Sequence, residues 1–180
     1  MYKALHSIVH PLVEKKQTGI MRLVHDYQGK GAIYLKEGEI EGIQTMEFSG
    51  AQAARRLAAW MSFTDEFLPT HYANISEVRG VETDGFMELL ERMAPLIADI
   101  ARVIPGNEAI FKTLAHRLNG ERSFTQKELQ IVMALDGHAT VKEVVRESGM
   151  TEFEVLYIIK KFCDSGLSEL WYMPTVELSA

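Results

Sequence analysis

The residues of this chain that could do chemistry are few and scattered. His6 and His10 form the only histidine pair at the i,i+4 spacing that brings two side chains onto one helix face. Two imidazoles at this spacing bind zinc in metalloproteases, where a glutamate directly follows the first histidine. Serine follows His6 here, so we expect no metal and no cofactor.

The remaining reactive groups do not assemble a catalytic set either. The single cysteine, Cys163, follows Phe162 late in a predicted helix, a position typical of a half-buried core residue rather than of a nucleophile. Gly29, Gly31 and Gly38 do not make a phosphate-binding loop, because no Gly-Lys-Ser/Thr sequence follows them. We therefore expect a protein that is not an enzyme.

Composition narrows the class of protein. The 180 residues are 47% hydrophobic and 24% charged, which is ordinary for a globular protein, and the net charge is −6. This balance provides no general attraction to nucleic acid or anionic lipid. One cysteine suits a reducing compartment, and no apolar run has the length of a signal peptide or a membrane span. We expect a cytoplasmic protein without membrane insertion.

Residues 18–61 contain the pattern around which the first domain is organised. Alternating apolar residues predict three strands joined by glycine-containing turns, at residues 20–25, 32–36 and 40–45. In the third strand we expect Ile40 and Gly42 on one face and Ile43 on the other. Gly42 would then let a helix approach that face closely.

Helices and a return strand complete this domain. An alanine-rich helix is predicted at 50–61 with Ser49 as its N-cap. Residues 63–68, with a turn at 64–66, are predicted to return the chain as a further strand, which Pro69 ends. A first helix is predicted at 4–16. Pro11 either kinks that helix or marks where its regular part begins.

The same residues resemble the PATAN domain, a bacterial signalling domain. The family pattern is a TG-x-L strand, a G-x-I-x-F-x-x-G-x-I hairpin, a helix and a W-x-x-G-x-F return strand. The matching positions here are Thr18, Gly19, Met21, Leu23, Gly31, Ile33, Leu35, Gly38, Ile40, Phe63 and Phe67. Asp65 stands where the family usually has glycine, and Gly42 where alanine is commoner.

This resemblance covers somewhat under half of the chain and implies a role in bacterial signal transduction. Relatives are often joined to receiver domains and are linked with motility, phototaxis or developmental regulation. The resemblance thus implies protein partners such as response regulators of two-component systems or motility components. Because its signature consists of glycines and core residues, it bears on the fold more than on activity.

The middle of the chain predicts a helical connector. One helix is expected at 82–103, interrupted at Pro95, and another at 108–118. The first carries a wide apolar stripe from Phe86 to Val103. This stripe either binds a partner or a second copy, the latter giving a homodimer, or packs between the two domains of its own chain.

The last third follows the winged helix-turn-helix plan. Helices are predicted at 123–135, from an N-cap at Thr140 onward, and from an N-cap at Thr151 to Asp164. A turn is expected at 136–138, and a glycine turn between the last two helices. A strand or wing at 167–173 follows. This run resembles the winged-helix segments that accompany PATAN domains.

The predicted fold class is therefore α+β. It comprises a small antiparallel sheet with packed helices, a long helical connector and a C-terminal winged-helix-like domain. The predicted boundaries are residues 1–78, 79–119 and 120–180.

The helix that would read DNA has the wrong charge for that task. Its first turns are expected to present Thr151, Glu152, Glu154 and Tyr157, and two carboxylates there would repel phosphates. Residues 120–166 hold six basic and eight acidic side chains. Protein contact is thus the main hypothesis, and a DNA-binding transcription regulator is the alternative.

A partner surface can be proposed only by elimination. After core and turn residues are set aside, the first domain leaves four outward side chains able to recognise a partner: Arg22, Tyr34, Arg55 and Arg56. The alternative for the arginine pair is an ordinary solvated helix face.

Overall fold

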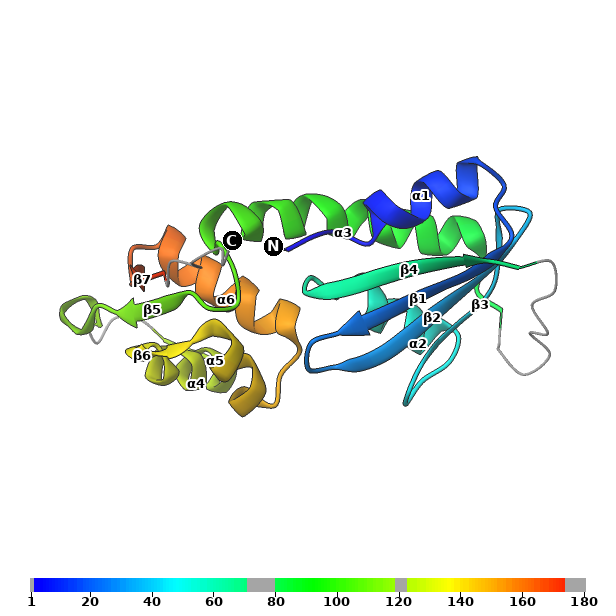
Figure 1. The fold of residues 1–180 in the computed structure, drawn as a ribbon. Helices are drawn as coiled ribbons and strands as arrows, with labels where there is room; N and C mark the ends of the chain where they lie inside the picture. The colour runs from blue at the N-terminus through cyan, green and yellow to red at the C-terminus, as the bar shows by residue number, and fades with distance from the viewer. Residues whose placement is uncertain (1, 71–79, 119–122, 174–180) are drawn as a thin grey trace, which may run out of the picture. The chain divides into compact units, whose positions relative to one another are not determined.

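The fold was obtained as a computed structural model, which describes residues 2–70, 80–118 and 123–173 (Figure 1). It is an α+β structure that divides into two compact units, residues 2–98 and 99–180. We call these the N-terminal and C-terminal units. The division falls inside a long helix, and the expected limits of the connector, at 78–79 and 119–120, lie outside the described residues.

A four-stranded antiparallel sheet with the order β3-β2-β1-β4 forms one layer of the N-terminal unit. Its strands are β1 (Gly19–His25), β2 (Gly29–Lys36), β3 (Glu39–Thr45) and β4 (Phe63–Pro69). The three predicted strands are confirmed. The turn expected at 64–66 is wrong, because β4 pairs with β1 along its whole length.

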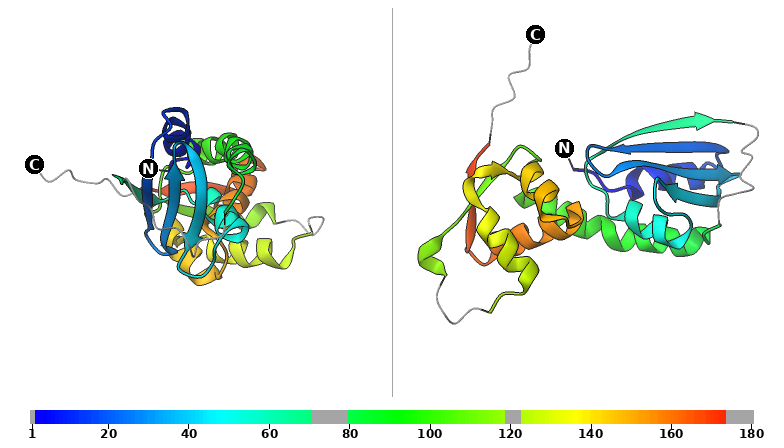
Figure 2. Two further views of the ribbon diagram at one scale, coloured as in Figure 1. Left: turned by 90° about the vertical axis from the view of Figure 1, so that its right-hand side faces the viewer. Right: turned by 90° about the horizontal axis from the view of Figure 1, so that it is seen from below.

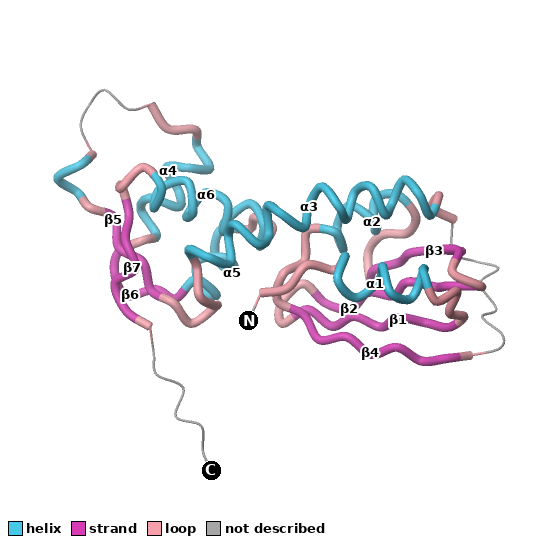
Figure 3. The backbone as a smooth tube through the Cα atoms, turned by 90° about the horizontal axis from the view of Figure 1, so that it is seen from above, coloured by secondary structure: helices cyan, strands magenta, loops and turns pink. Residues whose placement is uncertain are grey.

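Helices form the second layer, on one side of the sheet only (Figures 2 and 3). They are α1 (His6–Glu14), α2 (Ala51–Ala58) and the first part of α3 (Thr83–Val103). Pro11 lies within α1 and Pro95 within α3, and both helices continue through these prolines. Leu5, Val9, Leu57, Phe86 and Leu90 are buried against the inward residues of the sheet.

We expected a helix to approach the sheet closely at Gly42. The close approach occurs at Gly31 instead. A Cβ atom at Gly31 would lie 2.6 Å from Cδ2 of Leu57 and 3.4 Å from the Trp60 ring. Gly42 instead pairs with Tyr34 on the other side of the sheet. The N-cap prediction also fails, since Gly50 occupies that position with φ of 62° and no side chain caps α2.

A β-bulge explains why the expected alternation in β3 is wrong. Tyr34 pairs with Gly42, but Leu35 pairs with Ile40, which leaves Glu41 without a partner in the ladder. The extra residue shifts the side-chain parity. Ile40 and Ile43 are consequently both buried on the helix side, with exposures of 4% and 0%.

The stripe on α3 is largely covered within the chain. Phe86 and Leu90 belong to the core of the N-terminal unit, and Ile100 is fully buried. Leu96, at 43% exposure, is the large apolar side chain of the stripe that stays open. A homodimer through this stripe is therefore not supported, because most of its apolar surface is already buried.

The C-terminal unit combines three helices with a three-stranded antiparallel sheet of order β6-β5-β7. Its elements are β5 (Ile110–Thr113), a 3-10 turn η1 (Ala115–Arg117), α4 (Gln126–Ala134), β6 (Asp136–Thr140), α5 (Val141–Ser148), α6 (Glu152–Asp164) and β7 (Ser168–Tyr172).

The helix predicted at 108–118 is wrong, as is the turn predicted at 136–138. Residues 110–113 form β5, the central strand, which pairs with β6 and with the distant β7. A short apolar run suits either a helix or a buried strand, and here the long-range pairing decides. The three helices and the final strand are confirmed at the predicted places.

The three helices of this unit begin with the same device. In each, a threonine hydroxyl accepts a hydrogen bond from the backbone N–H three residues on, and the glutamate there accepts one from the threonine N–H. The pairs are Thr125–Glu128, Thr140–Glu143 and Thr151–Glu154. The caps at Thr140 and Thr151 were predicted.

Two of these carboxylates also join α4 to α6. Lys127 of α4 donates to Glu154 of α6 at 2.7 Å, while Lys161 of α6 donates to Glu128 of α4 at 2.5 Å. The Lys161 bond, together with the cap at Thr125, lowers the pKa of Glu128 to about 2. The pKa of Glu154 is lowered by Lys127 in the same way.

Replacing Gly19 by alanine should destabilise the N-terminal unit, because the new Cβ would overlap the carbonyl oxygen of Leu68 on β4. We expect a loss of about 1 to 3 kcal/mol in the free energy of unfolding. Urea unfolding followed by Trp60 fluorescence in a Trp171→Phe background measures it. Gly85→Ala is the matched control: its nearest neighbour would be 4.0 Å away, so stability should stay level or rise.

Acid should weaken the C-terminal unit through Glu128. A carboxylate whose pKa is lowered on folding stabilises the fold above its ordinary pKa of 4.5, and this contribution disappears as the pH falls toward about 2. The wild-type protein should therefore unfold at a higher urea concentration than Glu128→Gln at neutral pH. This difference in urea concentration should shrink as the pH falls from 4.5 toward about 2. Trp171 fluorescence in a Trp60→Phe background reports it. A difference in urea concentration that does not change with pH would contradict this role of the Glu128 carboxylate.

Candidate functional site

The face of the N-terminal sheet opposite the helices is the candidate site. Met21, Leu23, Ile33 and Leu35 point into the core, so the alternate residues of β1 and β2 point the other way. None of the described helices of this unit lies over that face (Figure 3). Arg22, Val24 and Lys30 are exposed there, and Ala32 and Tyr34 are half-buried.

This face contains a hollow of about 640 Å³ whose floor is the sheet itself. The register explains the hollow: Ala32, at the middle of β2, pairs with Arg22 on one side and Gln44 on the other. A methyl group between longer side chains leaves a depression. The residues around it are Ile20, Arg22, Leu23, Val24, Lys30, Gly31, Ala32, Tyr34, Gln44, Thr45, Met46, Thr64, Asp65 and Glu66.

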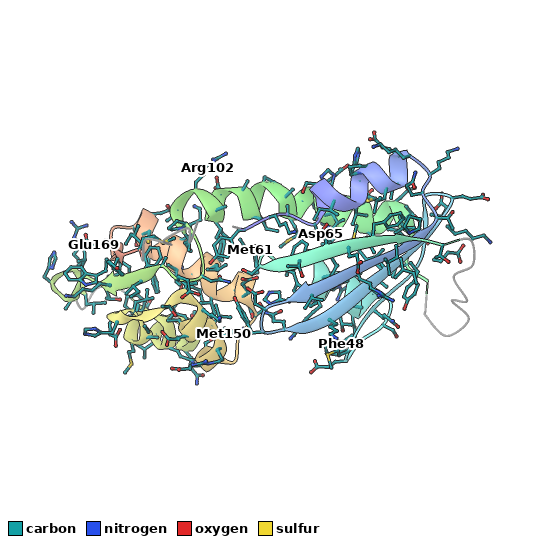
Figure 4. All side chains as sticks on the ribbon, viewed as in Figure 1. Phe48, Met61, Asp65, Arg102, Met150 and Glu169 are labelled. Carbon is teal, nitrogen blue, oxygen red and sulfur yellow. The ribbon has the colours of Figure 1, made fainter. Side chains whose placement is uncertain are left out.

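The polar residues around the hollow differ in whether they already bond to another side chain. The Gln44 amide donates to the Tyr34 hydroxyl, which orients both side chains. Asp65, labelled on β4 in Figure 4, accepts from Lys3. In contrast, no carboxylate of the described residues lies within ion-pair distance of the Arg22 guanidinium or the Lys30 ammonium. These two cations are available to a ligand.

The structure brings together two of the four predicted contact residues. Arg22 and Tyr34 share the open face, whereas Arg55 and Arg56 belong to α2 on the other side of the sheet. Arg56 lies 6.0 Å from the centre of the Phe48 ring, in the connection between β3 and α2 (Figure 4). The four do not form one surface. That any of them contacts a partner stays a prediction.

Several residues of the hollow were missed from the sequence. Lys30, Ala32, Gln44, Met46 and Glu66 look like ordinary strand and turn residues until the register is known. The available signal was that Arg22, Lys30 and Lys36 all stand at outward positions of β1 and β2. The segment around Lys30 was read as a loop because glycines flank it, and this concealed the signal.

The other reactive groups do not form a site. The rings of His6 and His10 lie 5.0 Å apart, and His10 Nδ1 is 3.4 Å from a Glu14 oxygen. Over the described ranges, no group of three or more His, Cys, Asp or Glu side chains is placed to hold a metal ion. Burial, with a smaller effect of Asp164, raises the pKa of Cys163 to about 11. This thiol is therefore protonated at neutral pH.

The start of α6 differs from the expectation that it presents two carboxylates. Glu152 is fully buried at 0% exposure, so the prediction that it faces outward is wrong. Glu154 caps its own helix and pairs with Lys127. Every basic side chain of α4 and α6 is likewise paired with a carboxylate, in the pairs Lys127–Glu154, Lys160–Asp164 and Lys161–Glu128.

No model of a protein family, no curated protein and no solved structure matches this chain. None of its described helices combines the length and apolar character needed to cross a membrane.

Proposed function

We propose that this protein is a non-enzymatic adaptor of bacterial signal transduction that binds a protein partner on the open face of its N-terminal sheet. The observation that carries the proposal is the hollow over Ala32, bordered by the two unpaired cations Arg22 and Lys30. Exposed, unpaired charges beside a depression in a rigid sheet are a surface suited to recognition.

The resemblance to PATAN domains supports the signalling part of the proposal. The positions that carry it have clear structural tasks in this chain: Gly19 lies against β4, Gly31 against α2, and Gly38, with φ of 87°, against the end of α1. We further propose that the C-terminal unit is a winged-helix domain used for protein contact. Response regulators and motility components are the partners that the resemblance implies.

Photo-crosslinking tests the proposal in the native bacterium. A photoreactive residue in place of Gln44, beside the hollow, should form adducts with response regulators or motility components, identified by mass spectrometry. A second substitution, Ala32→Trp, should suppress these adducts because indole fills the hollow. The same photoreactive residue in place of Glu147 on α5 is the control. Adducts that persist with Ala32→Trp, or arise equally at both positions, would argue against this face.

A DNA-binding transcription regulator is the second candidate. One observation favours it: burial of Glu152 removes a carboxylate that was expected to repel phosphates. Against it, the lysines of α4 and α6 are neutralised by neighbouring carboxylates. Phosphate contacts require available cations or other donors.

We therefore expect no salt-dependent retardation of labelled duplex DNA at micromolar protein. An electrophoretic mobility assay at low and physiological salt checks this. A shift that disappears with salt, and that Lys142→Glu on α5 abolishes, would reverse the order of the two candidates.

A further inference from the structure

The space between Arg22 and Lys30 has the features of a carboxylate site. Both side chains project from the same face, because Arg22 pairs in register with Ala32 and Lys30 with Val24. Ala32, which is opposite Arg22 and two residues from Lys30 on β2, has only a methyl group and leaves the space open, and Gln44 borders it from β3. A guanidinium can hold a carboxylate through two parallel hydrogen bonds, and an ammonium nearby adds a point charge.

The local charge at this hollow differs in sign from that of the whole protein. The chain carries a net charge of −6. Of the charged residues around the hollow, Arg22 and Lys30 are unpaired and Glu66 lies opposite Arg22 on β4. Asp65 is opposite the core-facing Leu23, so its side chain points to the other side of the sheet, and it pairs with Lys3. Two cations and one remaining carboxylate give a local balance of +1. Charges farther than about 10 Å away are screened at moderate salt, so the local sign governs binding.

Apolar side chains continue the site beside the cations. Val24 and Met46 are 43% and 77% exposed. Met46 lies over the start of β2, since a Cβ atom at Gly29 would be 3.0 Å from its sulfur. A methionine is adaptable and packs against varied apolar groups. The face therefore offers a charged position with an apolar position next to it.

We propose that this face binds an acidic, extended segment of a partner protein, with a carboxylate between Arg22 and Lys30 and an aliphatic side chain two residues away against Val24 and Met46. The inference rests on the proposed function and names the chemistry of the partner. In an extended segment, side chains two residues apart point to the same side, so they can reach such adjacent positions on a sheet.

Two other classes of ligand fit less well. Small-molecule sites usually enclose most of their ligand, whereas the hollow is lined by the sheet strands and the segment just after β3. Single-stranded nucleic acid needs a cationic track and aromatic stacking platforms. The hollow has two unpaired cations, and its one aromatic residue, Tyr34, is half-buried and hydrogen-bonded to Gln44.

The test uses the full chain, labelled with nitrogen-15, and two short acetylated peptides. One places aspartate or glutamate two residues from leucine or valine, with serine between them, and the other has lysine at every acidic position. The acidic peptide should shift the amide signals of β1 and β2 around Ala32, and the lysine peptide should not. Arg22→Glu should weaken binding about tenfold or more, as expected when an attractive charge becomes repulsive. Glu66→Gln should strengthen it.

Arg55→Glu is the matched control, because it reverses an exposed arginine on the helical side of the sheet and should leave the affinity unchanged. The signals of each variant away from the substituted residue confirm that it is folded. The proposal fails if neither peptide binds, if both bind equally, or if Arg55→Glu weakens binding as much as Arg22→Glu. It also fails if an oligothymidine binds this face and the acidic peptide does not.

The inference and the proposed function can fail separately. If the photoreactive residue at position 44 captures a partner and Arg22→Glu leaves the yield unchanged, the adaptor stands and the acidic-segment inference falls. If the position captures nothing and the acidic peptide does not bind, both fall.

Discussion

The contact between α2 and Gly31 is the constraint on which the N-terminal unit depends. A hydrogen atom in place of a side chain lets Leu57 and Trp60 press onto the sheet, and the alanines of α2 continue the same close packing. Interiors packed this tightly leave no room for a methyl group. Because the described helices lie on that side, they leave the other side of the sheet uncovered.

The C-terminal unit depends on charge as well as on apolar packing. Its glutamates cap helices and, at Glu128 and Glu154, hold α4 and α6 together at the same time. A tally of acidic and basic residues along the sequence therefore describes its surface poorly. Much of the charge is used internally, in hydrogen bonds whose direction and partners are fixed.

The sequence predicts local structure well and long-range pairing poorly. The strands β1 and β2, the caps at Thr140 and Thr151 and the helices they begin follow from spacing and residue type. The strand β5 could not be predicted, because only its pairing with β6 and with the distant β7 distinguishes it from a helix. The candidate site could be predicted only in part, for a related reason. Arg22 and Tyr34 stand out as side chains, whereas Ala32 matters for its small size at one point of the register.

The bulge at Glu41 also bears on how this chain should be compared with others. The bulge divides β3 into two parts. The inward residues before Glu41 and those after it occupy positions of opposite parity. An ungapped alignment to a relative with a regular strand would match core residues to surface residues over half of β3. Gly42, where the PATAN pattern more often has alanine, directly follows the bulged residue. A relative aligned with a one-residue gap at this point would restore the match of its buried positions.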